Sequence, residues 1–110
     1  MLHLHLVNDE KFVAPFMRRA DEAAKGEPQG YVVFGEKRAY QHLPDDPRIV
    51  HSSEWNPGMA SSVEKVYIHY ITFQKIRFYE KWLKPHKVTV CWIYFGNDLY
   101  EILQAFHGYS

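Results

Sequence analysis

The sequence has little of several features that would assign a protein to a familiar class. A single cysteine among 110 residues excludes an internal disulfide and is typical of a reducing compartment. Thirteen basic side chains balance thirteen acidic ones, so no net charge draws the chain to nucleic acid. No apolar run approaches the ~18 residues of a membrane span. The opening MLHLHLVNDE lacks the basic region and long apolar stretch of a signal peptide.

Several catalytic and cofactor motifs are also missing. No Gly-x-Gly-x-x-Gly follows the first apolar segment, and there is no Walker loop. No cysteines and histidines have zinc-ligand spacing, and the serines lie in no nucleophile elbow. His3 and His5 lie on the same face of an expected strand and could ligate a metal, but a third ligand is not evident. We therefore predict neither a metal nor a cofactor.

The composition is that of a globular protein, with 46% hydrophobic and 24% charged residues. Aromatic residues reach 16%, so rings make up much of the core or of a binding surface. A chain of this length supports one small hydrophobic core. We expect residues 1–110 to form a single Rossmann-like domain that is itself incomplete.

The clearest evidence for this fold is the stretch from Lys87 to Gln104, which predicts a strand, a tight turn and a helix. Val88 to Phe95 is rich in β-branched and aromatic residues, which predicts a strand buried on both faces. Gly96 ends it, and Asn97 is a good N-cap for a following helix. The helix itself is indicated by apolar residues at helical spacing, which are Leu99, Ile102, Leu103 and Phe106.

Four earlier strands are predicted on the same grounds, at Leu2–Val7, Tyr31–Phe34, Arg48–His51 and Val66–Tyr70. Residues 36–47 are too interrupted by proline for a long helix. Alternation of strands with helices predicts a three-layer α/β/α fold with a mostly parallel sheet of about five strands. With the first strand in the middle, the expected order is 3-2-1-4-5.

Two further helices are predicted from the spacing of apolar residues. The first has Phe12, Val13, Phe16, Met17 and Ala20 on one face, and it either begins near Pro15 or kinks there. The second begins at Thr72 and ends at Pro85. We expect its inward residues to be Phe73, Ile76, Tyr79 and Leu83, and its outward residues to be Lys75, Arg77, Lys81 and Lys84.

Three polar strand ends then meet at one edge of the sheet, where open α/β sheets bind ligands. They are Asn8–Asp9, His69–Tyr70 and Gly96–Asn97–Asp98. Each has an ordinary structural explanation, since Asn8–Asp9, Asn97 and Asp98 suit helix N-termini and His69 could be a surface histidine. Together with Tyr94, Tyr100 and Glu101 they suit a sugar, because rings stack on sugar faces and carboxylates bind hydroxyls. A histidine or carboxylate could also deprotonate an acceptor hydroxyl.

The segment Cys91 to Glu101, CWIYFGNDLYE, resembles the Trp-x-x-(Trp/Phe)-Gly-x-Asp-Leu-Tyr motif of a bacterial enzyme family. These are the 4-acetamido-4,6-dideoxygalactosyltransferases, or TDP-N-acetylfucosamine:lipid II N-acetylfucosaminyltransferases, of enterobacterial common antigen synthesis. The opening HLHLVNDEKFVAPFMRRADEA and the segment VYIHYI are similar to the family's first strand and helix and to its strand that ends in a histidine. The likeness covers most of the chain in order.

This resemblance implies the N-terminal half of a GT-B glycosyltransferase, which holds the acceptor, while a C-terminal domain holds the nucleotide-sugar donor. The family acts at the cytoplasmic face of the inner membrane on a polyprenyl-diphosphate-linked glycan, without a required metal. Carried over to this chain, it implies catalytic roles for His69 and Asp98. It also implies substrate binding by Trp92, Gly96, Tyr100 and Glu101, which match the motif. From the convergence of the strand ends we further expect substrate binding by Asn8, Asp9, Tyr70, Tyr94 and Asn97.

Two alternatives remain open. The chain could be a stand-alone, flavodoxin-like module that binds a small ligand without catalysis, or a structural remnant of a transferase. Because the donor domain is missing, we expect the chain alone to be inactive. We also expect the surface left by that domain to favour a homodimer.

Overall fold

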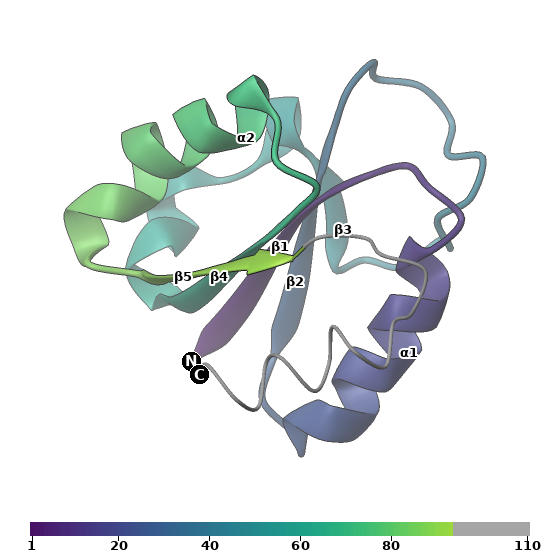
Figure 1. Cartoon of the computed structure of the whole chain (residues 1–110), viewed down its shortest axis with the longest axis horizontal. Coiled ribbons are helices and arrows are strands. Elements are labelled where there is room, and N and C mark those ends of the chain that lie inside the picture. Colours follow the sequence, from purple (N-terminus) through teal and green to yellow (C-terminus); the bar gives the residue numbers. More distant parts are fainter. Residues whose placement is uncertain (94–110) are drawn as a thin grey trace.

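The protein forms a five-stranded, all-parallel sheet between helices (Figure 1). The structure, a computed structural model, describes residues 1–93. The strands are β1 (Leu2–Asn8), β2 (Gln29–Phe34), β3 (Ile49–His51), β4 (Val63–His69) and β5 (Thr89–Ile93). Their order is β3-β2-β1-β4-β5. The predicted Rossmann-like α/β fold and its strand order are therefore confirmed, and the order differs from that of flavodoxins.

Helices cover both faces of the sheet (Figure 1). On one face lies α1 (Val13–Ala24), and on the other lies α2 (Phe73–Phe78), which continues as the π-helical turn η3 (Tyr79–Leu83) and the 3-10 turn η4 (Lys84–His86). Two short 3-10 turns, η1 (Ser52–Glu54) and η2 (Pro57–Ser62), lie between β3 and β4. No helix within residues 1–93 has the length and apolar character that a membrane crossing requires.

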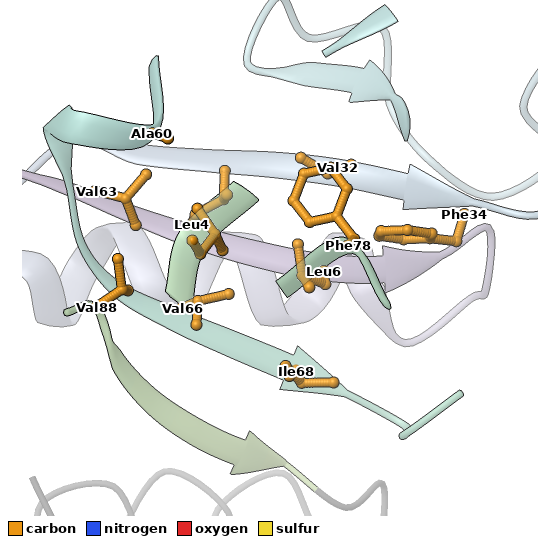
Figure 2. Close-up of a cluster of buried hydrophobic side chains, with 11 residues drawn as sticks. Leu4, Leu6, Val32, Phe34, Ala60, Val63, Val66, Ile68, Phe78 and Val88 are labelled. Atoms are coloured by element: carbon orange, nitrogen blue, oxygen red, sulfur yellow. The ribbon is translucent and has the colours of Figure 1, made fainter. Parts of the chain in front are cut away.

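The face toward α2 carries an entirely apolar core (Figure 2). Alternate residues of the three central strands point into it, as the two-residue period of a strand requires. Phe78 of α2 and Leu83 of η3 close the cluster from above. The buried members are Leu4, Leu6, Val32, Phe34, Ala60, Val63, Val66, Ile68, Phe78, Leu83 and Val88.

The face toward α1 mixes apolar and polar side chains. The predicted helix face is confirmed for Val13, Phe16, Met17 and Ala20, which are buried, whereas Phe12 is 43% exposed. Pro15 lies in the first turn of α1, where its missing N–H costs no helical bond. The helix therefore begins near this proline rather than kinking at it.

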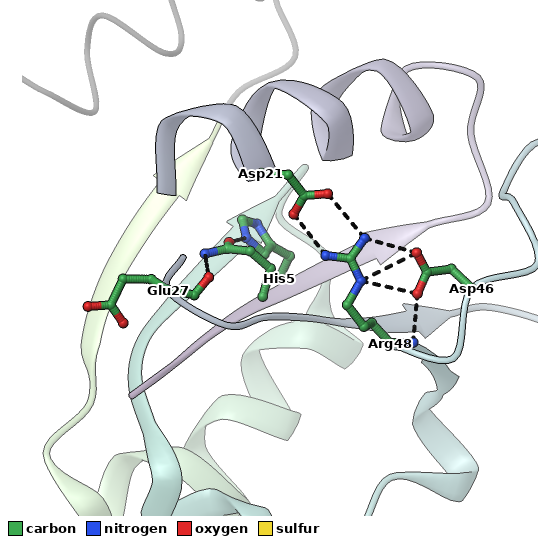
Figure 3. Close-up of polar contacts among 6 residues, drawn as sticks. His5, Asp21, Glu27, Asp46 and Arg48 are labelled. Carbon is green, nitrogen blue, oxygen red and sulfur yellow. Dashed lines mark hydrogen bonds and ion pairs between the residues drawn. The ribbon is translucent and has the colours of Figure 1, made fainter. Parts of the chain in front are cut away.

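Salt bridges of Arg48 connect α1 to the segment before β3 (Figure 3). The Arg48 guanidinium donates to both carboxylate oxygens of Asp21 on α1, at 2.8 and 3.2 Å. It also donates to both oxygens of Asp46. These bonds to Asp46 and Asp21 hold the pKa of Arg48 above its ordinary value. The loop 36–47, which forms no helix as predicted, is thereby anchored at its far end.

Two sequence predictions about exposure are wrong. Thr89 and Trp92 of β5 are exposed, so this strand is not buried on both faces; within residues 1–93 it is an edge strand that pairs with β4 alone. On the second helix the prediction is wrong at two positions, since Phe73 is 73% exposed and Lys75 is fully buried. Leu83 is buried and Arg77, Lys81 and Lys84 are exposed, as predicted, while Ile76 and Tyr79 are half-buried. The helix is rotated because the Lys75 ammonium finds three oxygen acceptors at the strand ends below it.

Candidate functional site

The carboxyl ends of β1 and β4 form the switch point of the sheet. From β1 the chain runs through α1 to β2 on one side, and after β3 it returns to β4 on the other side of β1. Crossovers that leave in opposite directions open a crevice between the two strand ends, and α/β proteins bind ligands there. Asn8 ends β1 and His69 ends β4, so the structure brings two of the three predicted corners together.

The third corner lies outside the described residues. Tyr94, Gly96, Asn97, Asp98, Tyr100 and Glu101 all belong to that part of the chain. The strand that precedes them does reach the same edge, because the backbone N–H of Tyr70 donates to the carbonyl of Ile93, the last residue of β5, at 3.0 Å. Trp92, on the same strand, is 49% exposed.

Lys75 joins the ends of β1 and β4. Its Nζ donates to Asn8 Oδ1 at 2.5 Å, to the Tyr70 carbonyl at 2.8 Å and to the His69 carbonyl. All three of its N–H donors therefore have partners. Thr72 caps α2 as predicted, since its Oγ1 accepts from the backbone N–H of Lys75 at 3.3 Å. Burial lowers the pKa of Lys75 to about 8.

Asp9 anchors a loop rather than facing open solvent. Its carboxylate accepts from the backbone N–H groups of Gln41, His42 and Leu43, at 2.7, 2.9 and 3.2 Å. Burial alone would raise the pKa of Asp9, but these three donors outweigh it and the pKa is lowered. The loop 36–47 is thus fixed against the end of β1.

His69 belongs to a buried chain of hydrogen bonds on the α1 face. Its Nε2 lies 2.9 Å from His5 Nδ1, and His5 Nε2 lies 2.7 Å from Gln29 Oε1. The Gln29 amide nitrogen donates to the Glu27 carbonyl at 3.3 Å. Figure 3 shows His5 on the side of the sheet that faces α1, the helix that carries Asp21. The rings of Tyr31 and Tyr67 stack against His5, with centroids 4.7 and 4.6 Å away.

The donor and the acceptor in each of these hydrogen bonds can be assigned by starting from Gln29. Because the Gln29 NH₂ group donates to a carbonyl, its Oε1 must accept, and His5 Nε2 carries the proton. Burial lowers the pKa of His5 to about 3, so the ring is neutral and its Nδ1 accepts. His69 Nε2–H is then the donor between the two rings. Burial, followed by the charges of His5 and Lys75, keeps the pKa of His69 well below its ordinary value.

The His69 imidazole consequently lies in the core. It is 1% exposed and meets the Phe16 ring edge-on, with centroids 4.6 Å apart. The predicted catalytic histidine thus stands at the right strand end, but its ring points away from the crevice. What it offers to the crevice is its backbone carbonyl, which holds Lys75.

A pocket of about 200 Å³ opens at the carboxyl ends of β1 and β2. Its polar lining is largely acidic, and Tyr40, 37% exposed, adds a ring. Burial raises the pKa of that phenol. The pocket is lined by Asn8, Asp9, Glu10, Val33, Phe34, Gly35, Glu36, Arg38 and Tyr40.

Sequence reasoning found Asn8 and Asp9 but missed four members of this lining, which are Glu10, Glu36, Arg38 and Tyr40. Two of them had a signal in the sequence, since Glu10 directly follows Asn8–Asp9 and Glu36 begins the polar loop after β2, whose end belongs to the same edge. Arg38 and Tyr40 lie farther along that loop, where the sequence does not show that the loop returns to the pocket. Tyr70, one of the predicted aromatic residues of the site, is 59% exposed and adopts a left-handed backbone with φ 56°.

A group of possible metal ligands lies near the opposite, amino-terminal edge of the sheet. Ligand atoms of His3, Glu27 and Glu64 lie within 4.8 Å of one another. The ring of His3 is oriented by Tyr67, whose hydroxyl is 2.7 Å from Nδ1, and His3 Nε2 is 3.8 Å from Glu64. The structure therefore supplies the carboxylates that the sequence did not reveal beside His3.

Comparison of this chain with protein-family models, with curated proteins and with solved structures yields no match.

Proposed function

We propose that this chain is the acceptor-side, Rossmann-like domain of a GT-B glycosyltransferase. In this proposal it holds a polyprenyl-diphosphate-linked glycan, and a separate C-terminal domain supplies a deoxyamino sugar from a nucleotide-sugar. The observation that carries the proposal is the polar pocket at the carboxyl edge, beside the switch point of a 3-2-1-4-5 sheet. The motif resemblance of residues 91–101 gives the reaction class.

The chemistry of the pocket suits a sugar. Glu10 and Glu36 offer carboxylates to hydroxyl groups, and Arg38 offers donors. Tyr40 provides a partly exposed ring on which the apolar face of a sugar can stack. Because Asp9 is held by three backbone amides, its role in the proposal is to fix the pocket wall that carries Tyr40.

The hydrophobic part of a lipid-linked acceptor also has a suitable surface. Tyr70, Ile71 and Phe73 follow one another along the turn into α2 and are 59%, 36% and 73% exposed. Arg77 lies over the Phe73 ring, 5.3 Å from its centroid. Exposed rings beside cations are typical of surfaces that touch the membrane interface. In the proposal this turn makes a peripheral contact with the inner membrane.

The catalytic base in this proposal is Asp98, which would take the proton of the acceptor hydroxyl. Asp98 follows Ile93 by five residues in the sequence. The Ile93 carbonyl accepts a hydrogen bond from the Tyr70 backbone N–H at the carboxyl edge of the sheet. His69 acts as a positioning residue, because its carbonyl holds Lys75 and its ring is buried.

One observation favours a second candidate, a non-catalytic module that binds a small sugar-like ligand. The histidine expected to act as a base is removed from the crevice, as described above. Such a module would use the same pocket with the same residues. Its strand order remains the Rossmann one.

The experiment is a ¹⁵N NMR titration with a short-chain polyprenyl-diphosphate disaccharide in detergent micelles. We expect shift changes at Asn8, Glu10, Glu36 and Tyr40. Glu36→Gln should weaken binding about fivefold, because it removes one charged acceptor. The matched control is Glu22→Gln, an exposed position on α1 that does not line the pocket.

The outcomes separate the two candidates. Binding of the disaccharide diphosphate but not of the free disaccharide supports the acceptor-side domain, while equal binding of both supports the small-ligand module. Absence of shifts in the pocket at saturating ligand contradicts both.

A further inference from the structure

A second groove, of about 360 Å³, lies on the other side of the Phe34–Gly35 strand end. It opens between the carboxyl ends of β2 and β3 and the outer side of α2. Phe34, Gly35 and Phe78 contribute its less polar part. Its polar lining consists of Ser52, Ser53, Gln74, Arg77 and Lys81. This lining is basic, whereas that of the first pocket is mostly acidic.

Among the described residues, the two cations of this groove have no acidic partner. Within residues 1–93, neither Arg77 nor Lys81 forms a salt bridge, although Arg48 and Lys37 both do. Each instead rests on a ring, Arg77 over Phe73 at 5.3 Å and Lys81 over Trp82 at 4.7 Å from the centroids. Such contacts hold the side-chain stems while leaving the N–H donors available. The residues are four apart, so they lie one turn from each other along the helix.

The two serine hydroxyl groups of the groove differ, because that of Ser53 is hydrogen-bonded to His51. The Ser53 backbone N–H donates to His51 Nδ1 at 3.2 Å, so that nitrogen is unprotonated. The Ser53 hydroxyl, 2.8 Å away, therefore also donates to it, while His51 Nε2–H donates to the Gly35 carbonyl at 2.9 Å. This fixes the turn after β3. Ser52 is half-buried in the groove, and within residues 1–93 its hydroxyl has no hydrogen-bond partner, so it can donate to a ligand.

We propose that this groove binds a phosphate-type oxyanion, and a diphosphate better than a single phosphate. Arg77 presents a planar fork that matches two oxygens of one phosphate, and Lys81 presents a point charge one turn away. Ser52 and Gln74 add neutral donors. The groove is larger than one phosphate group needs, and its two separated cations match two linked phosphates. This inference does not depend on the proposed glycosyltransferase function, because it rests on a different cavity.

The test is a ¹⁵N NMR titration of the full chain with sodium pyrophosphate and, in parallel, with inorganic phosphate, against sodium chloride at equal ionic strength. We expect saturable shifts at Ser52, Gln74, Arg77 and Lys81, with tighter binding of pyrophosphate. Replacement of both cations in Arg77→Ala/Lys81→Ala should weaken pyrophosphate binding about tenfold or more, since each removes a charge-assisted contact.

The matched control is Arg18→Ala/Lys84→Ala, which removes one Arg and one Lys from exposed positions outside the groove. It should bind pyrophosphate as the unchanged chain does. An equal loss in both double variants would show attraction to overall positive charge and overturn the proposal. Shifts that follow ionic strength alone, or that avoid these four residues, would overturn it too.

A third experiment distinguishes a lipid phosphate from a free phosphate as the ligand. Cosedimentation with phosphatidylcholine vesicles, with and without phosphatidylglycerol, reports binding to a lipid phosphate. If pyrophosphate competes with the anionic vesicles and Arg77→Ala/Lys81→Ala abolishes both, one groove serves both sources. If neither soluble anion binds, the proposal is overturned even when the vesicles do bind, because the exposed turn of Tyr70, Ile71 and Phe73 can account for vesicle binding.

Discussion

The two faces of the sheet use the same strands for different kinds of packing. Toward α2, the buried residues that alternate along the three central strands are aliphatic or phenyl side chains. Toward α1, the intervening residues include two histidines, a glutamine and two tyrosines, which are His5, His69, Gln29, Tyr31 and Tyr67. The one-letter alternation LHLHL at the start of the chain already contains both patterns.

The difference concerns what each face requires to be stable. The α2 face gains free energy from the apolar area it removes from water, without directional demands. The α1 face gains area from its rings, but each buried nitrogen or oxygen must also keep its hydrogen-bond partner. The His69–His5–Gln29 chain has only one arrangement of protons that satisfies its members. It is therefore the part of the core that acid can disrupt.

The largest expected effect is loss of stability in acid. The pKa of His5 falls from 6.5 in the unfolded chain to about 3 in the native state, and that of His69 is also lowered. Between these values the unfolded state binds more protons than the native state, so stability falls as pH decreases from 6.5 toward 3. A histidine that is protonated only in the unfolded chain contributes a slope of roughly 1 kcal/mol per pH unit. Urea unfolding at a series of pH values measures it.

Two variants separate this effect from ordinary destabilisation. Leu6→Ala makes a cavity on the α2 face and should cost about 2–5 kcal/mol without changing the pH slope. His5→Leu removes a ring of the α1 face, costs about 1–3 kcal/mol at neutral pH, and should flatten the slope. His86→Gln, at an exposed position, should change neither. Equal slopes in His5→Leu and Leu6→Ala would refute the distinction between the faces.

A smaller effect is expected at Lys75, which is the one buried cation on the α2 side within residues 1–93. Lys75→Met keeps the side-chain volume but leaves Asn8 Oδ1 and the carbonyls of His69 and Tyr70 without their donor. Because these acceptors lie at the edge of the sheet, water can replace some of the lost hydrogen bonds. We therefore expect the free energy of unfolding to fall by about 1–3 kcal/mol. Faster amide hydrogen exchange at Tyr70 and Ile71 would locate the damage at the strand ends.

The control for this prediction is Lys84→Met, an exposed position farther along the same helical segment. It should leave both stability and exchange unchanged. If Lys75→Met matches it, the ammonium does not hold the ends of β1 and β4 together, and the rotation of α2 needs another cause.

Lys75 also marks the limit of what the sequence could predict. Strand order, the alternating faces and the α1 stripe follow from local patterns such as LHLHL and the spacing of Val13, Phe16, Met17 and Ala20. The rotation of α2 does not, because a lysine among aromatic residues is normally exposed. Its burial depends on three oxygens that come together only when β1 and β4 pair.

The candidate site was predictable to a similar degree. Parallel topology alone brings Asn8 and His69 to one edge. The side of the sheet to which the last side chain of a strand points depends on the pleat of that strand. His5 and His69 point to the same face of the sheet, so both rings lie under α1. Tyr40 and Arg38 could not be assigned, because their loop is held in place by the long-range bonds between Asp9 and residues 41–43.

The smallest expected effect tests whether every polar group of the α1 face is needed. The hydroxyl of Tyr31 is buried and has no hydrogen-bond partner within residues 1–93, and burial raises the pKa of the phenol. Tyr31→Phe keeps the ring stacked on His5 and removes only this hydroxyl, so stability should be unchanged or rise by up to about 1 kcal/mol. Tyr67→Phe, which breaks the hydrogen bond to His3, should instead lower it. Urea unfolding compares the two, and a clear loss in Tyr31→Phe would mean that this hydroxyl is also part of the network.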